Sequence, residues 1–202
     1  MMAAESDDGL DSARVAMVKI HQLTGSKLRK FLQDFITGVD GSELLVRTTP
    51  KVDGQAYRIA WLNGKVMMEL SKSGLLDKDG VKNDSHLKSY EKNFYEYNEK
   101  HNAKKVSDFI KSMGLDGIKV IGEILPNAEG LVDDNGTITY VGTTYDATKL
   151  GKEGTLVMFD VKGMTSERMY DLDPVQVEEI KDFLSTDATD TSVQFMDINK
   201  FA

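Results

Sequence analysis

The residues best suited to covalent chemistry lie in TTPKVDGQAYRIAWLNGKV, a stretch that begins at Thr48. Lys51 stands at the edge of a predicted strand and is followed by Asp53 and Gly54. A lysine amine becomes a nucleophile near neutral pH when burial or a neighbouring cation lowers its pKa. Asp53 would lie on the same side of an extended chain as Lys51, where it could hold the lysine rotamer or a metal. Gly54 would let a substrate approach the backbone, but a surface lysine on a strand remains the alternative.

The segment after Gly54 is predicted to form a β-hairpin. Apolar residues alternate with polar ones over 57–61 and again over 66–70, and Asn63-Gly64 separates the two runs. Asn-Gly is a strong hairpin signal because both residues accept the positive φ angles of a tight turn. The hairpin would therefore fix the strand that starts beside Lys51.

Helical spacing of apolar residues predicts the helices. The first lies within 11–37 and is either broken at Gly25 or a pair of helices. A long charged helix or helix pair covers 86–114, with Ser85 as its cap and Gly114 as its stop. Its aromatic stripe indicates core packing rather than a platform for stacking bases. A short acidic helix starts at Asp173-Pro174, which suit the cap and the first turn.

The remaining strands are predicted at 117–125 and 155–163, with a second Asn-Gly hairpin over 130–142. Hairpins alternating with helices favour an α+β class with largely antiparallel sheets and flanking helices. Residues 1–10 are acidic and predicted to be disordered. We expect one domain over 11–170 that includes the N-terminal helical segment, followed by an acidic helix and a weakly structured polar tail over 171–202.

Composition excludes several classes of function. The 202 residues carry a formal net charge of −8 and no cysteine, so thiolate catalysis, disulfides and thiolate metal sites are excluded. The acidity argues against a broad nucleic-acid-binding face and leaves only local or weak contacts. The three histidines lie far apart in the sequence.

The N-terminus lacks the apolar core of a signal peptide, and no apolar run is long enough to span a membrane. We therefore expect a cytoplasmic location, either in a cell or, for a viral protein, in the host cytoplasm or the virion.

Other catalytic and metal-binding motifs do not fit. The acidic turns VDDNGT and DKDGVKND lack the aspartate that an EF-hand loop places five residues before its glycine, since Leu131 and Leu75 stand there. Neither a Walker-type phosphate loop nor a G-x-S-x-G elbow occurs. The nucleophile candidate therefore remains Lys51.

The sequence around Lys51 resembles the nucleophile motif of the covalent nucleotidyltransferases, which are the DNA ligases, RNA ligases and messenger-RNA capping enzymes. Their motif reads K-x-D-G, and in NAD-dependent DNA ligases K-x-D-G-x-A is followed by an aromatic residue and an N-G turn. KVIGEIL, with Glu123, is similar to the family's third motif, and TLVMFDVKG, with Phe159, to the motif that follows. The three segments occur in the family's order over roughly residues 48–163.

This resemblance implies a ligase-type nucleotidyltransferase (ATP-grasp-like) adenylation domain that uses ATP or NAD with Mg²⁺. Lys51 would form a lysine–AMP intermediate for joining nucleic acid ends. Asp53 and Gly54 would line the nucleotide site, and Lys72 would lie near the sugar and phosphates. Glu123 would contact the ribose hydroxyls or a metal, and Phe159 would stack on the adenine base.

The sequence also departs from the family. The fourth motif, E-G-x-V, and the fifth, K-x-K, do not occur after Gly163, where an acidic helix and a polar tail follow. The chain therefore resembles the front part of an adenylation domain, as an incomplete piece or a degenerate relative, and a phage origin is one of the alternatives. The alternative function is a ligase-like fold that serves as a structural or interaction module, for example in a phage particle or another large assembly.

Overall fold

The computed structural model of this chain describes residues 24–36, 52–70, 74–127, 132–140 and 143–200. The chain divides into two compact units, Met1–Pro50 and Lys51–Ala202. In the first unit the structure describes helix α2 (Gly25–Ile36), which lies inside the predicted N-terminal helical segment. No further element of this unit falls within the described ranges. The candidate site residues from Lys51 onward belong to the second unit.

The second unit is built on one large β-sheet, in which the described residues form seven strands. The strand order is β3-β2-β1-β4-β7, and both β8 and β9 pair with the outer edge of β7. Every pairing is antiparallel except β7 with β9, which is parallel. The strands are β1 (Gln55–Leu62), β2 (Lys65–Leu70), β3 (Gly74–Leu76), β4 (Gly117–Leu125), β7 (Thr155–Met164), β8 (Met169–Asp171) and β9 (Gln194–Asp197).

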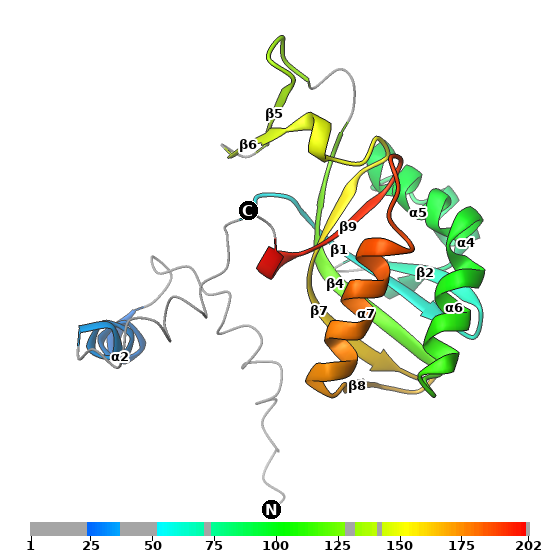
Figure 1. Ribbon diagram of the computed structural model, residues 1–202, viewed down its shortest axis with the longest axis horizontal. Coiled ribbons are helices and arrows are strands. Elements are labelled where there is room, and N and C mark those ends of the chain that lie inside the picture. The colour runs from blue at the N-terminus through cyan, green and yellow to red at the C-terminus, as the bar shows by residue number, and fades with distance from the viewer. Residues whose placement is uncertain (1–23, 37–51, 71–73, 128–131, 141–142, 201–202) are drawn as a thin grey trace, which may run out of the picture. The chain divides into compact units, whose positions relative to one another are not determined.

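Helices cover one face of this sheet (Figure 1). They are α4 (Lys78–Asn83), α5 (Ser89–His101), α6 (Ala103–Ser112) and α7 (Pro174–Thr186). α4 and α5 contact β2, α6 contacts β1 and β4, and α7 contacts β7 and β9. The predicted α+β class with a largely antiparallel sheet is therefore confirmed.

The hairpin predicted at Asn63-Gly64 is present. β1 and β2 pair from Leu62 with Lys65 to Arg58 with Glu69, and the turn residues have φ angles of 51° and 78°. Asparagine and glycine tolerate this left-handed backbone better than other residues. The local sequence therefore determines the turn.

The predicted helices also form, with changes at their ends. The long charged segment is divided into α5 and α6, and Gly114 ends it with a φ angle of +75°. The predicted cap at Ser85 is wrong, because α5 begins after Lys88, whose amide donates to the Glu91 carboxylate at 2.8 Å. The predicted start at Asp173 is confirmed, since its carboxylate accepts from the Val175 amide at 2.8 Å.

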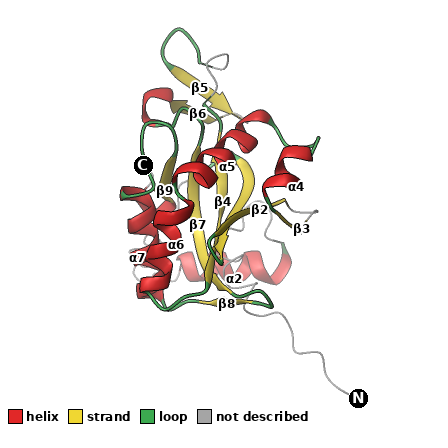
Figure 2. Ribbon diagram, turned by 90° about the vertical axis from the view of Figure 1, so that its right-hand side faces the viewer, coloured by secondary structure: helices red, strands yellow, loops and turns green. Residues whose placement is uncertain are grey.

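The predicted second Asn-Gly hairpin differs from the structure. The turn at Asn135-Gly136 closes a single bridge between Val132 and Ile138. The regular hairpin instead pairs β5 (Thr137–Tyr140) with β6 (Thr143–Asp146) and is followed by a short 3-10 helix, η3 (Ala147–Lys149). It projects beyond one end of the large sheet (Figures 1 and 2). Pairing over four positions stabilises the later hairpin more than one bridge could.

The C-terminal stretch was expected to be weakly structured, but it completes the sheet. β9 pairs with the first half of β7 and is followed by a short 3-10 helix, η4 (Ile198–Lys200). The carboxylate of Asp197 pairs with the Lys181 amine at 3.2 Å, and the two side chains are only 2% and 4% exposed. A buried pair of this kind requires both partners, because either charge alone would be desolvated without compensation. This ion pair therefore joins α7 to β9.

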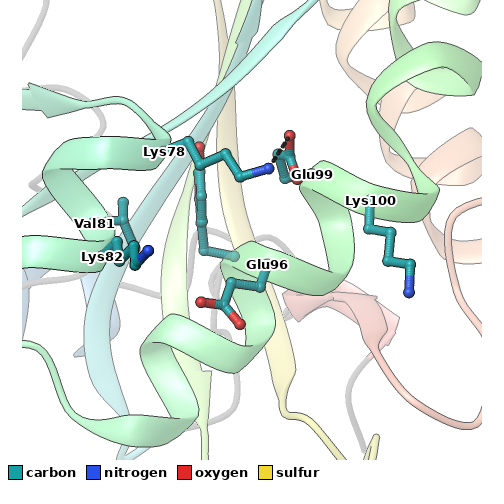
Figure 3. A pocket seen from close by; sticks show the side chains of 7 residues that line it. Lys78, Val81, Lys82, Glu96, Glu99 and Lys100 are labelled. Atoms are coloured by element: carbon teal, nitrogen blue, oxygen red, sulfur yellow. Dashed lines mark hydrogen bonds and ion pairs between the residues drawn. The ribbon is translucent and has the colours of Figure 1, made fainter.

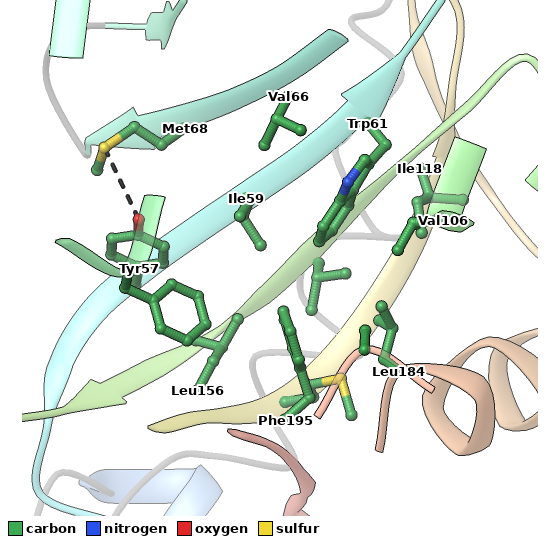
Figure 4. Close-up of a cluster of buried hydrophobic side chains, with 14 of the residues drawn as sticks. Tyr57, Ile59, Trp61, Val66, Met68, Val106, Ile118, Leu156, Leu184 and Phe195 are labelled. Carbon is green, nitrogen blue, oxygen red and sulfur yellow. Dashed lines mark hydrogen bonds between the residues drawn. The ribbon is translucent and has the colours of Figure 1, made fainter. Parts of the chain in front are cut away.

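Phe195 of β9 lies at the centre of the hydrophobic core between the sheet and the helices (Figure 4). Its ring centroid lies 5.4 Å from that of Phe94 on α5 and 6.1 Å from that of Trp61 on β1. These tilted arrangements are favourable for aromatic pairs. A single residue of the tail thus contacts two elements, α5 and β1, that lie far from it in the sequence.

We predict that Phe195→Ala lowers the free energy of unfolding by about 3–5 kcal/mol, the usual cost of removing a buried ring from a core. Chemical denaturation followed by tryptophan fluorescence measures it, because Trp61 is the chain's one tryptophan. Phe183→Ala is the control, since Phe183 is only partly buried where it stacks on Phe109. If the two variants were equally stable, β9 would not belong to the core.

Candidate functional site

The candidate site lies where β1 begins beside the end of β4. The amide of Gly54 donates a hydrogen bond to Oε2 of Glu123, with a nitrogen–oxygen distance of 2.7 Å. The register pairs Gln55 with Ile124 and Ala56 with Glu123, so the two segments predicted to form the site are neighbours in the sheet. Charge-assisted hydrogen bonds to a carboxylate are stronger than neutral ones. This contact therefore ties the candidate nucleophile loop to β4.

Gly54 is required here by the protein's own packing. A Cβ atom at this position would lie 2.7 Å from the carbonyl oxygen of Ile124 and 3.0 Å from Cβ of Glu123. The sequence predicted that a substrate would approach this backbone, but it is β4 that approaches it in the structure. The absence of a side chain lets the Gly54 amide reach Glu123.

Asp53 is held from the other side by the β5–β6 hairpin. Its amide donates to the hydroxyl oxygen of Tyr145 at 2.9 Å, and its carboxylate accepts a hydrogen bond from the Thr143 hydroxyl. The side chain is buried, and a buried carboxylate needs such partners to offset its desolvation. Asp53 is therefore part of a hydrogen-bonded network rather than a solvent-exposed acid.

A small apolar cluster, here called the site cluster, lies beneath this network. It includes Val52 from the loop, Tyr145 from the hairpin, Val157 from β7 and Ile198 from η4. Phe159 packs against it and is partly buried. The register between β4 and β7 shifts between Ile121 and Gly122, and Phe159 is the extra residue of that irregularity. Phe159 lies two residues after Val157, so the alternation of side chains places both on the side of this cluster.

Glu123 points to the sheet face that the helices leave uncovered. Ile124, its neighbour, belongs to the core beneath the helices, and side chains alternate between the two faces of a strand. The same alternation places Arg58, Lys119 and Lys162 on the open face with Glu123. This face therefore carries three cations together with Glu123.

These cations are paired with acidic side chains. The Lys119 amine contacts Oε2 of Glu69 at 2.6 Å, and Arg58 lies 3.8 Å from the same oxygen. Lys162 contacts Asp160 at 3.1 Å and Asp171 at 2.5 Å. Burial lowers the pKa of Lys162, but its hydrogen bonds to the two aspartates outweigh burial and raise the pKa above its usual value. Lys162 therefore stays protonated at neutral pH.

The predicted site residues have three different outcomes. Asp53, Gly54 and Glu123 come together at one end of β1 and β4. Phe159 comes from the next strand and packs on the cluster that contains Val52. The predicted nucleophile Lys51 and the predicted sugar and phosphate contact Lys72 lie outside the described residues.

Sequence analysis missed the contribution of Thr143 and Tyr145. They lie 90 and 92 residues from Asp53, and their local sequence, TTYD, is an ordinary strand pattern. The available signal was that Thr143 and Tyr145 are two residues apart, which in a strand places them on the same face. It indicates that the two side chains point the same way, but it does not identify their partner.

The described residues contain no metal centre built by protein groups alone. Within the described ranges, no three His, Asp or Glu side chains are grouped so that they could hold a metal ion. Mg²⁺ is often bound by one or two carboxylates together with the phosphates of a nucleotide. Glu123 and Asp53 are the two carboxylates of the site.

A hollow of about 410 Å³ lies elsewhere, between α4 and α5 (Figure 3). Lys78 and Glu99 form an ion pair at 3.4 Å on its wall. Val81 and Tyr95, which also line it, belong to the same core as Ile124. The hollow is therefore on the helical side of the sheet, opposite the face to which Glu123 points.

Comparison with known proteins does not assign the chain to a family. No protein-family model matches it, and a search of curated protein sequences finds no match. Within the part of the chain that the structure describes, no helix combines the length and the apolar character needed to cross a membrane.

We predict that Gly54→Ala lowers the free energy of unfolding by about 1–3 kcal/mol, because the added methyl group would overlap the backbone of β4. Gly80→Ala is the control, since the atoms nearest to a Cβ there belong to the Leu76 side chain and alanine favours a helix. It should stay within about 1 kcal/mol of the wild type. A Gly54→Ala variant as stable as Gly80→Ala would contradict the close approach of the loop to β4.

Proposed function

We propose that this protein contains a ligase-like nucleotidyltransferase domain that binds an adenine nucleotide where β1 begins beside the end of β4. The activity would be the transfer of AMP through Lys51 to a 5′-phosphorylated nucleic acid end. The observation that carries the proposal is the hydrogen bond between the Gly54 amide and Glu123. It joins two of the three motifs that the sequence shares with this enzyme class.

The position of Phe159 is a second support. β4 and β7 are neighbouring strands, so the second and third of the three segments that carry the resemblance follow the first in the order β1-β4-β7. Phe159 packs against the site cluster. This cluster contains Val52, the residue that follows Lys51. An aromatic ring on that cluster offers an apolar surface on which a base can stack.

In the proposed reaction, the Lys51 amine attacks the α-phosphorus of ATP or NAD. A nitrogen–phosphorus bond forms, the bond to the leaving group breaks, and pyrophosphate or nicotinamide mononucleotide departs. The amine loses its proton during this step, and AMP remains on the lysine as a phosphoramide. The AMP then passes to the 5′-phosphate of a nucleic acid end, which regenerates the lysine.

Mg²⁺ bound with the nucleotide would neutralise part of the charge on the phosphates. The residues that would hold it are Glu123 and, from the same site, Asp53. The described residues contribute in other ways as well. Glu123 orients the loop through the Gly54 amide, and the site cluster excludes water from one side of the loop.

The electrostatics of the open face bear on the strength of binding. Arg58, Lys119 and Lys162 are each paired with at least one carboxylate. Among the described residues, these three cations are therefore already compensated and do little to attract a polyanion to this face, and the net charge of the whole chain is −8. This supports weak or local contact with nucleic acid and retains the structural or interaction module as the second candidate.

We predict that the protein incubated with Mg²⁺ and α-labelled ATP, or with NAD labelled in its AMP half, gains label that survives denaturation. Lys51→Arg should lose the label completely, because a guanidinium stays protonated and is not a nucleophile at neutral pH. The matched control is Lys65→Arg, a change at an exposed lysine of β2. It should keep the label.

Three results would lead to different conclusions. Equal labelling of wild type and Lys51→Arg would remove Lys51 as the nucleophile. Nucleotide binding without covalent label would favour a domain that kept the fold and lost the reaction. Neither label nor binding with either nucleotide would leave the structural or interaction module as the better hypothesis.

A further inference from the structure

The β5–β6 hairpin is attached to the candidate site by two hydroxyl groups. Thr143 and Tyr145 are two residues apart on β6, so they point to the same face of the hairpin. That face is turned toward the loop, since Tyr145 and Ile138 both belong to the site cluster. Thr144, on the other face, is exposed and hydrogen-bonds to Thr139 at 2.9 Å.

The two hydroxyls act on different parts of Asp53. Tyr145 accepts a hydrogen bond from the Asp53 amide at 2.9 Å, and Thr143 donates to the Asp53 carboxylate. The next residue, Gly54, donates its amide to Glu123. The amides of Asp53 and Gly54 are therefore held by two different elements, the first by the hairpin and the second by β4.

Burial raises the pKa of the Tyr145 hydroxyl. Burial is the largest cause and, together with the smaller effect of the Asp53 and Glu123 carboxylates, it outweighs the hydrogen bonds from the Asp53 amide and Thr143, which lower the pKa. The hydroxyl is therefore neutral at physiological pH. A neutral hydroxyl can accept from the amide without placing a third negative charge beside two carboxylates.

We propose that Thr143 and Tyr145 are positioning residues: their hydroxyls fix Asp53 so that the following amide, that of Gly54, meets Glu123. The proposal makes the nucleophile loop depend on a hairpin about 90 residues further along the chain. The effect on AMP transfer rests on the proposed function of Lys51. The effect on the loop itself does not.

The first test measures backbone amide hydrogen exchange by NMR in Tyr145→Phe. This change keeps the ring in the site cluster and removes only the hydroxyl. We expect exchange at Asp53 and Gly54 to become about fivefold to tenfold faster, as for the loss of one hydrogen bond. Exchange at Ile59 and Val120, in the core parts of β1 and β4, should not change.

A matched set of threonine variants tests the second hydroxyl. Thr143→Val should speed exchange at Gly54, and Thr143→Ser, which keeps a hydroxyl, should restore it. Thr144→Val is the control on the exposed face of the same strand and should leave exchange unchanged. Unchanged exchange at both Asp53 and Gly54 in Tyr145→Phe and Thr143→Val would overturn the proposal. Equal acceleration at Ile59 and Val120 would also overturn it, because the hairpin would then only add global stability.

The second test uses the covalent labelling reaction. In Tyr145→Phe we expect the labelling rate at saturating nucleotide to fall about tenfold, while the nucleotide concentration that gives half the maximal rate stays the same. This separates positioning of the loop from loss of nucleotide binding. If the wild type takes no label, the proposed function fails, and the exchange measurements alone decide whether the two hydroxyls hold the loop.

Discussion

The register between β1 and β4 is the constraint on which the rest of the structure depends. The two strands pair over eight positions, from Gln55 with Ile124 to Leu62 with Gly117. Because side chains alternate along a strand, a shift of one residue would turn Glu123 into the core and Ile124 out of it. The same shift would separate the Gly54 amide from its carboxylate partner. The stability of the core and the geometry of the candidate site therefore depend on one pairing.

The two faces of the sheet have different roles because of this register. The face beneath the helices is filled by large apolar side chains such as Trp61 and Phe195, and it provides most of the buried apolar area. The open face carries Glu123 and the paired cations, with a second, smaller apolar cluster beside them. The site cluster draws on the loop, the hairpin, β7 and the C-terminal segment. Three distant parts of the chain thus support a short loop next to Lys51.

Sequence patterns predicted most of the elements but fewer of their contacts. The Asn63-Gly64 hairpin and the start of α7 at Asp173 follow from local rules, because turn and cap geometry depend on adjacent residues. The predicted cap at Ser85 was wrong because the Lys88 amide and the Glu91 carboxylate form the cap of α5 three residues later. The prediction of a weakly structured tail was wrong because the order of that segment depends on packing, which local patterns do not contain. Phe195 illustrates this, since one aromatic residue in a polar stretch becomes part of the core only when α5 and β1 provide its surroundings.

The sequence by itself determined the α+β class, the first hairpin, the strands over 117–125 and 155–163, and the grouping of Asp53 and Gly54 beside Lys51. It also singled out Glu123 and Phe159 by resemblance to an enzyme class. Only the tertiary structure decided that the Gly54 amide donates a hydrogen bond to Glu123. It also decided that the hydroxyl groups of Tyr145 and Thr143 hydrogen-bond to Asp53. The physical reason is distance along the chain: these contacts span 69 to 92 residues. Side chains so far apart meet only after the sheet has formed, and no local pattern records which partner each will find.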